Sequence, residues 1–181
     1  MVEVPRRANA VRNRARILDV ARALLAERGT AVGMDEIAAA AGLAVGTLYR
    51  HFPNKRDLVV AALGETLAEV TDEIDAAASS IRSGAPAGEV LEALLADGAG
   101  AERRLHALKE AAVLLGHDSH ATPAMSTMTR AIEGLLAAGR DRDQIRADIG
   151  ADDIYLLLAS APRDERRSRW VHLMLASIVR A

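Results

Sequence analysis

The sequence predicts an all-α fold of about nine helices, with a small three-helix domain at the front and a larger helical bundle behind it. The chain is rich in Ala, Leu and Arg and has few runs of β-branched residues. No segment alternates apolar and polar residues with period two over a useful length, whereas several repeat their apolar residues with the 3.6-residue period of a helix. With 181 residues, half of them hydrophobic, the chain is long enough to bury a good core.

Helix-ending residues divide the chain into its expected elements. Gly29 is expected to end a first helix whose apolar residues follow the helical period, and Asn54, with Asp57 three positions later, is a good N-cap for a long fourth helix. Later breaks are expected at SGAPA (83–87), at 98–100, at GHDSHATP (116–123), at a charged loop over 139–150 and at Pro162. Outside the 37–52 motif, the expected helices cover residues 11–27, 55–82, 89–97, 101–115, 124–138, 152–161 and 164–179.

Residues 37–52, IAAAAGLAVGTLYRHF, fit two short helices joined by a tight turn at Gly42. Their apolar positions at helical spacing are Ile37, Ala38 and Ala41 on the first helix and Val45, Leu48 and Phe52 on the second. Two such helices can bury one small core between them, and Gly42 can take the positive φ that re-aims the chain. This is the layout of a helix-turn-helix DNA reader.

The second short helix then turns a polar edge to solvent. That edge comprises Gly46, Thr47, Arg50 and His51, with Tyr49 at its margin. Its side chains can hydrogen-bond phosphates or base edges, and Gly46 allows close approach of the backbone. An ordinary helical hairpin in an Ala-rich protein is the alternative, but the basic string VGTLYRHFPNKRDL favours the DNA reader.

These segments resemble the TetR family of transcriptional regulators. The resemblance runs through RNRARILDVARALLAERG (12–29) and MDEIAAAAGLAVGTLYRHFPNKRDLV (34–59). It implies a helix-turn-helix DNA-binding domain over 10–57, with its motif at about 33–52, and a C-terminal ligand-binding and dimerisation domain over 58–181. It further implies a homodimer, most often a repressor, that binds a palindromic double-stranded DNA operator and is released by a small-molecule effector.

The resemblance also suggests residue roles. Thr47, Tyr49 and Lys55 would contact phosphates, Arg50 and His51 would lie near base edges or the backbone, and the start of the first helix would meet phosphate. Val45 stands where many family members carry a polar base-reading residue, so its readout is limited to apolar contact, for example with a thymine methyl. Gly33 stands where a Ser or Thr often caps a helix, and it offers no side-chain oxygen.

Charge distribution supports DNA binding independently. Residues 1–56 hold ten Arg or Lys against five acids, and the rest of the chain holds thirteen against twenty. The net charge is therefore +5 over residues 1–56 and −7 over residues 57–181, although the whole chain carries only −2. A solvated basic tail followed by an Arg-rich surface helix is the structural alternative.

The C-terminal helices suggest a dimer interface and a pocket. The expected interface residues are Ile154, Leu157, Leu158, Trp170, Leu173, Met174, Ser177 and Ile178. These residues form one apolar stripe on each of the last two helices. The two helices of each subunit would together make a four-helix bundle across a dimer, unless the stripes pack inside one subunit. The expected effector-pocket residues are Leu94, Leu105, His106, Lys109, His117, Met125, Met128 and Ile132, although most of the apolar ones would be core in any helical domain.

Other function classes are weaker. No cysteine is present, which excludes disulfides and thiol chemistry, and no long apolar run indicates a membrane span, so we expect a cytoplasmic protein. The cluster His117, Asp118, Ser119 and His120 could in principle serve hydrolysis or metal binding, but sequence neighbours rarely point at one site. We therefore expect no enzyme, metal or cofactor, and keep a helical adaptor that binds protein as a third possibility.

Overall fold

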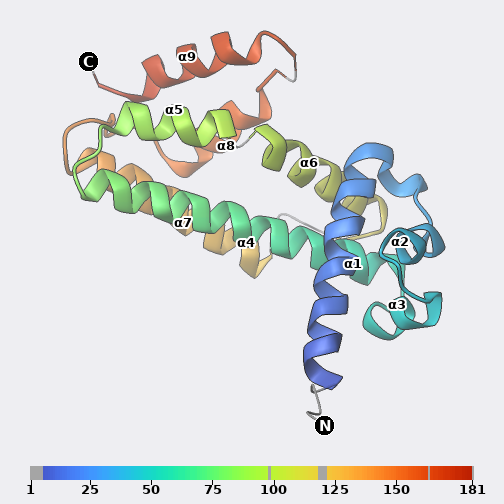
Figure 1. Cartoon of the computed structure of the whole chain (residues 1–181). Coiled ribbons are helices and arrows are strands. Elements are labelled where there is room, and N and C mark those ends of the chain that lie inside the picture. Colours follow the sequence, from blue (N-terminus) through green and yellow to red (C-terminus); the bar gives the residue numbers. More distant parts are fainter. Residues whose placement is uncertain (1–5, 98, 118–121, 163, 181) are drawn as a thin grey trace. The chain divides into compact units, whose positions relative to one another are not determined.

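The computed structural model describes residues 6–97, 99–117, 122–162 and 164–180 (Figure 1). These parts form nine α-helices, one short 3-10 turn and a single isolated β-bridge, so the all-α expectation is confirmed. The chain separates into two compact units, one made of residues 1–66 and 102–122 and the other of residues 67–101 and 123–181.

The first unit holds the front three helices. Its elements are α1 (Arg6–Arg28), η1 (Gly29–Ala31), α2 (Met34–Ala40), α3 (Val45–His51), the first turns of α4 (Lys55–Arg82) and most of α6 (Ala99–Leu114). Helix α1 packs on α2, and α2 packs on α3. The buried apolar side chains of this unit include Ile17, Leu18, Leu25, Ile37, Leu48, Leu58 and Leu108.

The turn between α2 and α3 forms as the sequence predicts. Gly42 has φ +63°, and its N–H donates to the carbonyl of Ala39 at 2.9 Å. The next amide, Leu43, donates to the carbonyl of Ala38, also at 2.9 Å. This pair of bonds is a Schellman motif, which needs a left-handed residue and satisfies the last carbonyls of α2. Gly42 therefore fixes the direction in which α3 leaves.

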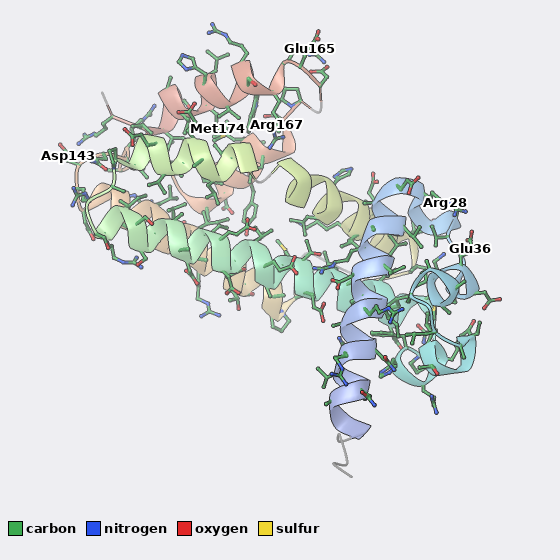
Figure 2. The ribbon with its side chains drawn as sticks, viewed as in Figure 1. Arg28, Glu36, Asp143, Glu165, Arg167 and Met174 are labelled. Carbon is green, nitrogen blue, oxygen red and sulfur yellow. The ribbon has the colours of Figure 1, made fainter. Side chains whose placement is uncertain are left out.

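The Glu36 carboxylate binds the backbone amide at the N-cap of α2, which is Gly33. The Gly33 N–H donates to Oε2 of Glu36 at 2.7 Å, and Arg28 at the end of α1 pairs with Oε1 at 3.0 Å (Figure 2). The backbone hydrogen bond from Gly33, and then the Arg28 guanidinium, lower the pKa of Glu36 below its ordinary value. One carboxylate thus joins the end of α1 to the start of α2.

The second unit contains the later helices. Its elements are the rest of α4, α5 (Ala87–Asp97), α7 (Pro123–Arg140), α8 (Ala151–Ala159) and α9 (Arg167–Ile178). Helix α5 packs along α9, and the label of Met174 in Figure 2 marks a side chain between them. Thr129 of α7 and Tyr155 of α8 are hydrogen-bonded through their hydroxyl groups at 2.9 Å.

The charged segment after α7 is more structured than the loop expected there. Ile145 forms a β-bridge with Val179, in which the Arg146 N–H donates to Ile178 and the Arg180 N–H donates to Gln144. The Gln144 side chain accepts a hydrogen bond from the Ala87 amide at the start of α5. Pairing between residues so distant in sequence leaves no local pattern, which is why the sequence did not reveal it.

Most of the expected helices form within a few residues of their predicted bounds. The largest differences are at α1, which begins at Arg6 instead of residue 11, and at α9, which begins at Arg167 instead of residue 164. Asp164 instead accepts hydrogen bonds from the backbone and side chain of Arg166, in the turn that precedes α9. Local side-chain bonds of this kind compete with helix formation.

Two glycines of α7 give a matched test of packing. A Cβ on Gly139 would collide with the side chain of Ile145, which is 2% exposed, whereas a Cβ on Gly134 would meet no atom within 4 Å. We expect Gly139→Ala to lower the free energy of unfolding by about 1–3 kcal/mol through overpacking. Gly134→Ala should raise it by about 0.5–1 kcal/mol through helix propensity. Urea unfolding of both variants checks this, and equal effects would contradict the packing seen at Gly139.

The Glu36 cap predicts a pH dependence of stability. Because the folded-state pKa of Glu36 lies below its unfolded value of 4.5, its contribution is fully present above pH 4.5 and is lost as the pH falls through the folded pKa. We expect Glu36→Gln to lower stability near neutral pH and to show a smaller loss than wild type on acidification below pH 4.5. Glu27→Gln, at an exposed carboxylate of α1, is the control. Thermal melts from pH 3 to pH 7 measure the difference, and parallel curves for wild type and Glu36→Gln would rule the cap out.

Candidate nucleic-acid interface

Helix α3 buries one edge and exposes the other. Leu48 is fully buried and Phe52 is 3% exposed, whereas Gly46, Arg50 and Tyr49 are exposed, Tyr49 by 44%. Thr47 and His51 are half-buried. The expected edge is thus exposed at Gly46, Tyr49 and Arg50 and only partly exposed at Thr47 and His51. Their contacts with DNA stay predictions.

Val45 lies at the exposed start of α3. It is 39% exposed, although the sequence grouped it with the apolar positions that bury a core between the two short helices. The residue that closes that core from α3 is Leu48 instead, one turn further along, followed by Phe52. Val45 is therefore available to a partner, in agreement with its other expected role as an apolar contact.

The polar residues of α3 are partly organised by one another. Nη2 of Arg50 donates a hydrogen bond to Oγ1 of Thr47 at 3.0 Å, across one turn of the helix. The guanidinium has further N–H donors, so this bond holds the side chain along the helix and leaves donors for a partner. Arg50 is accordingly oriented before any ligand arrives.

Arg14 of α1 connects the end of α3 to α4. Its guanidinium carbon lies 5.1 Å from the centroid of the Phe52 ring, a cation–π distance, and its Nη1 is 3.0 Å from Oε1 of Glu65. Both charged side chains of this ion pair are partly exposed, so its electrostatic contribution to stability is small. Its structural effect is to fix where α3 ends.

Lys55 makes hydrogen bonds inside the protein that the sequence analysis did not predict. Its ammonium group is half-buried and donates hydrogen bonds to the backbone carbonyls of Thr30 and Val32, in the segment between α1 and α2. An ammonium group has three N–H donors, so two are used inside the protein. Lys55 thus has a structural role, and its expected contact with phosphate stays a prediction. The sequence could not show the structural role, because the fold of residues 29–33 decides where those carbonyls point.

The start of α1 adds positive charge beside the turn of the motif. Helix α1 extends past α2 and α3 in Figure 1, and its exposed Arg12 donates to the side chain of Asn9. Arg16 is exposed too, and its Nη2 is the atom that a Cβ on Gly42 would meet. The guanidinium of Arg16 therefore lies against the α2–α3 turn, a placement that the sequence analysis did not predict.

The residues expected to line an effector pocket are divided between the two units. Leu105, His106, Lys109 and His117 belong to the first unit, and Leu94, Met125, Met128 and Ile132 belong to the second. Met128 and Ile132 are buried at 4% exposure each, His106 pairs with Glu110 at 3.1 Å, and burial lowers the pKa of Lys109. A shared pocket stays a prediction.

The expected dimer residues separate by burial. Met174 and Ile178 are 5% and 1% exposed within the chain, so their side chains already belong to the core of the second unit, and their expected place in a dimer interface stays a prediction. Leu173 is 54% exposed and Ser177 is exposed, while Ile154, Leu157, Leu158 and Trp170 are half-buried. Leu156 of α8, which the sequence analysis missed, is 72% exposed. Leu156 stands directly before the expected interface residues Leu157 and Leu158, and this run of leucines was the available sequence signal.

The suspected polar cluster falls largely outside the described residues. Asp118, Ser119 and His120 of the suspected polar cluster lie outside them. Among the residues that are described, no group of three or more His, Asp or Glu is arranged to hold a metal ion. Of the helices in those same ranges, none combines the length and apolar character needed to cross a membrane.

Three comparisons with known proteins bear on this arrangement. A family model described as bacterial regulatory proteins, tetR family, matches residues 17–62. The transcriptional repressor KstR of Mycolicibacterium smegmatis is 46% identical over 66 residues, which are 36% of this chain and 32% of that protein. This chain therefore matches about a third of the length of that repressor.

Longer matches extend over most of the chain. An uncharacterized HTH-type transcriptional regulator of Mycobacterium tuberculosis is 32% identical over 166 residues, which cover 91% of this chain and 73% of the relative. The crystal structure of a TetR transcription regulatory protein from Mycobacterium vanbaalenii has 34% sequence identity and a TM-score of 0.77, with coverage of 97% of this chain and 100% of that one. These matches confirm the resemblance carried by residues 12–59, and the chain belongs to the TetR family of bacterial transcriptional regulators.

Proposed function

We propose that this regulator binds a palindromic DNA operator as a homodimer, represses transcription there, and releases the DNA when a small-molecule effector binds its C-terminal part. The observation that carries the proposal is the solvent-facing edge of α3, where Arg50 and Tyr49 are exposed while Leu48 and Phe52 are buried. A helix held in this way by its own apolar edge presents the other edge to a major groove.

Charge supports a polyanionic partner for the same unit. Residues 1–56 carry a net charge of +5, and the exposed Arg12, Arg16 and Arg50 belong to them. The remaining chain carries −7, which disfavours DNA contact elsewhere. Neutralisation of phosphates by arginines releases condensed counterions, and this release provides most of the non-specific affinity.

The regulatory half of the proposal rests on α4 and on the family. Helix α4 contributes buried residues to both units, Leu58 and Ala62 in the first and Ile74 and Ile81 in the second. A continuous helix shared in this way can carry a shift from an effector site to the DNA reader. KstR, one of the relatives, is named a repressor, and repression is proposed here on that likeness.

The test is salt-dependent binding of double-stranded DNA. A labelled duplex selected from a random-sequence pool should bind the full chain, and its affinity should fall by about 100- to 1000-fold between about 50 and 200 mM salt, as expected for roughly four to six phosphate contacts. Fluorescence anisotropy measures this. Indifference to duplex DNA at low salt would instead favour the adaptor that binds protein.

Two variants divide the proposed interface by role. Arg50→Met should change the ranking of duplexes, because the guanidinium donors that Thr47 leaves unused can hydrogen-bond base edges. Lys55→Met should weaken binding to all duplexes by a similar factor, since it removes a positive charge and releases the carbonyls of Thr30 and Val32. Unchanged rankings in the Arg50 variant would remove that residue from base readout.

Dimerisation is tested at the exposed leucines of the second unit. We expect the double variant Leu156→Glu, Leu173→Glu to be monomeric at concentrations where the wild type is a dimer, because an apolar interface does not accept unpaired carboxylates. Leu114→Glu is the matched control, since Leu114 of α6 is 73% exposed, almost the same as Leu156. Sedimentation velocity gives the oligomeric state. A dimeric double variant, or a monomeric control, would move the interface elsewhere.

A further inference from the structure

The N-cap and the first two residues of α3 offer only apolar and small side chains to a partner. The N-cap residue Ala44, then Val45 and Gly46, are all exposed, and Val45 retains 39% of its accessible surface. A Cβ on Gly46 would have no heavy atom within 4 Å, so the space around this turn is open. None of these three residues has a side chain that can donate or accept a hydrogen bond.

The first polar side chain of α3 is Thr47, which follows two residues after Val45 and is half-buried. Its hydroxyl oxygen already accepts a hydrogen bond from Nη2 of Arg50 at 3.0 Å. Arg50 and Val45 are five residues apart, about 7.5 Å along a helix axis. The two residues therefore project from α3 at well-separated points along its axis.

Only one group on the floor of the major groove is apolar. The 5-methyl group of thymine projects there, whereas the other base edges present hydrogen-bond donors and acceptors. An isopropyl group placed against a donor or acceptor would strip it of water without replacing the lost hydrogen bond, which is unfavourable. Against a methyl group the same side chain buries apolar surface at no such cost.

We propose that Val45 reads the 5-methyl group of a thymine in each operator half-site, at a base pair separate from the one that Arg50 contacts. The proposal rests on the DNA-binding function proposed above and adds the chemical group that is recognised. It makes the discrimination at this base pair one of methyl contact instead of hydrogen bonding. The selected duplexes should accordingly share a thymine at one fixed position of each half-site.

Replacing thymine by deoxyuridine tests the proposal, because it removes the methyl group and keeps base pairing. Each thymine of a duplex selected from a random pool is replaced in turn, and the dissociation constant is measured by anisotropy at one salt concentration. For the wild-type chain we expect one position per half-site at which deoxyuridine weakens binding by about three- to fivefold, the effect of about one buried methyl group.

The matching protein variants assign that effect to a residue. Val45→Ala should bind the thymine and deoxyuridine duplexes with the same affinity, whereas Val113→Ala should keep the difference. Val113 is the control because it is also an exposed valine, at 53%, but lies on α6 of the same unit. Thermal melts of both variants should match the wild type, since neither side chain is part of the core.

The outcomes separate this inference from the proposed function. A chain that binds duplex DNA with the expected salt dependence, but tolerates deoxyuridine at every position, would overturn methyl readout and leave the DNA-binding function standing. An equal deoxyuridine penalty in Val45→Ala would also overturn it, because another residue would then contact the methyl group. Absence of any duplex binding would remove both proposals.

Discussion

The arrangement of the candidate interface depends on the burial of Leu48 and Phe52. Helix α3 has seven residues, too few to be stable in water without tertiary packing. Its orientation is therefore decided by where those two side chains fit, and the cation–π contact from Arg14 to Phe52 helps to fix its end. Leu48 and Phe52 are four residues apart and project from the same side of the helix. Their burial therefore fixes which edge of α3 faces solvent.

The basic residues of the first unit serve two purposes that charge counts alone cannot separate. Arg14 and Arg28 pair with Glu65 and Glu36, and Lys55 bonds two backbone carbonyls, so these three cations hold the unit together. Arg12, Arg16 and Arg50 are exposed and have no carboxylate partner among the described contacts. At least three of the ten cations in residues 1–56 are therefore already engaged inside the protein.

Features that depend on local pattern could be predicted from the sequence. The 3.6-residue period located the long helices, and the spacing around Gly42 predicted both the turn and the burial of Leu48. Local pattern does not determine how distant segments meet. Met174 and Ile178 belong to an apolar stripe that could equally face α5 or a second subunit, and only the packing of α9 decides between them. Lys55 and the bridge between Ile145 and Val179 depend on such contacts too.

A reader helix that begins with Val45 and Gly46 separates affinity from selectivity. Contacts between arginines and phosphates are strong, long-ranged and independent of sequence, so they determine how tightly the unit holds any duplex. Val45 has no charge and acts only at van der Waals distance, so it contributes little to non-specific binding. Its contact with a thymine methyl group would instead form only when α3 is aligned with the correct base pairs of the operator. Selectivity that arises from apolar contact is also less screened by salt than selectivity that arises from ion pairs. In this chain, raising the salt concentration should weaken all binding while leaving the preference at that base pair largely intact.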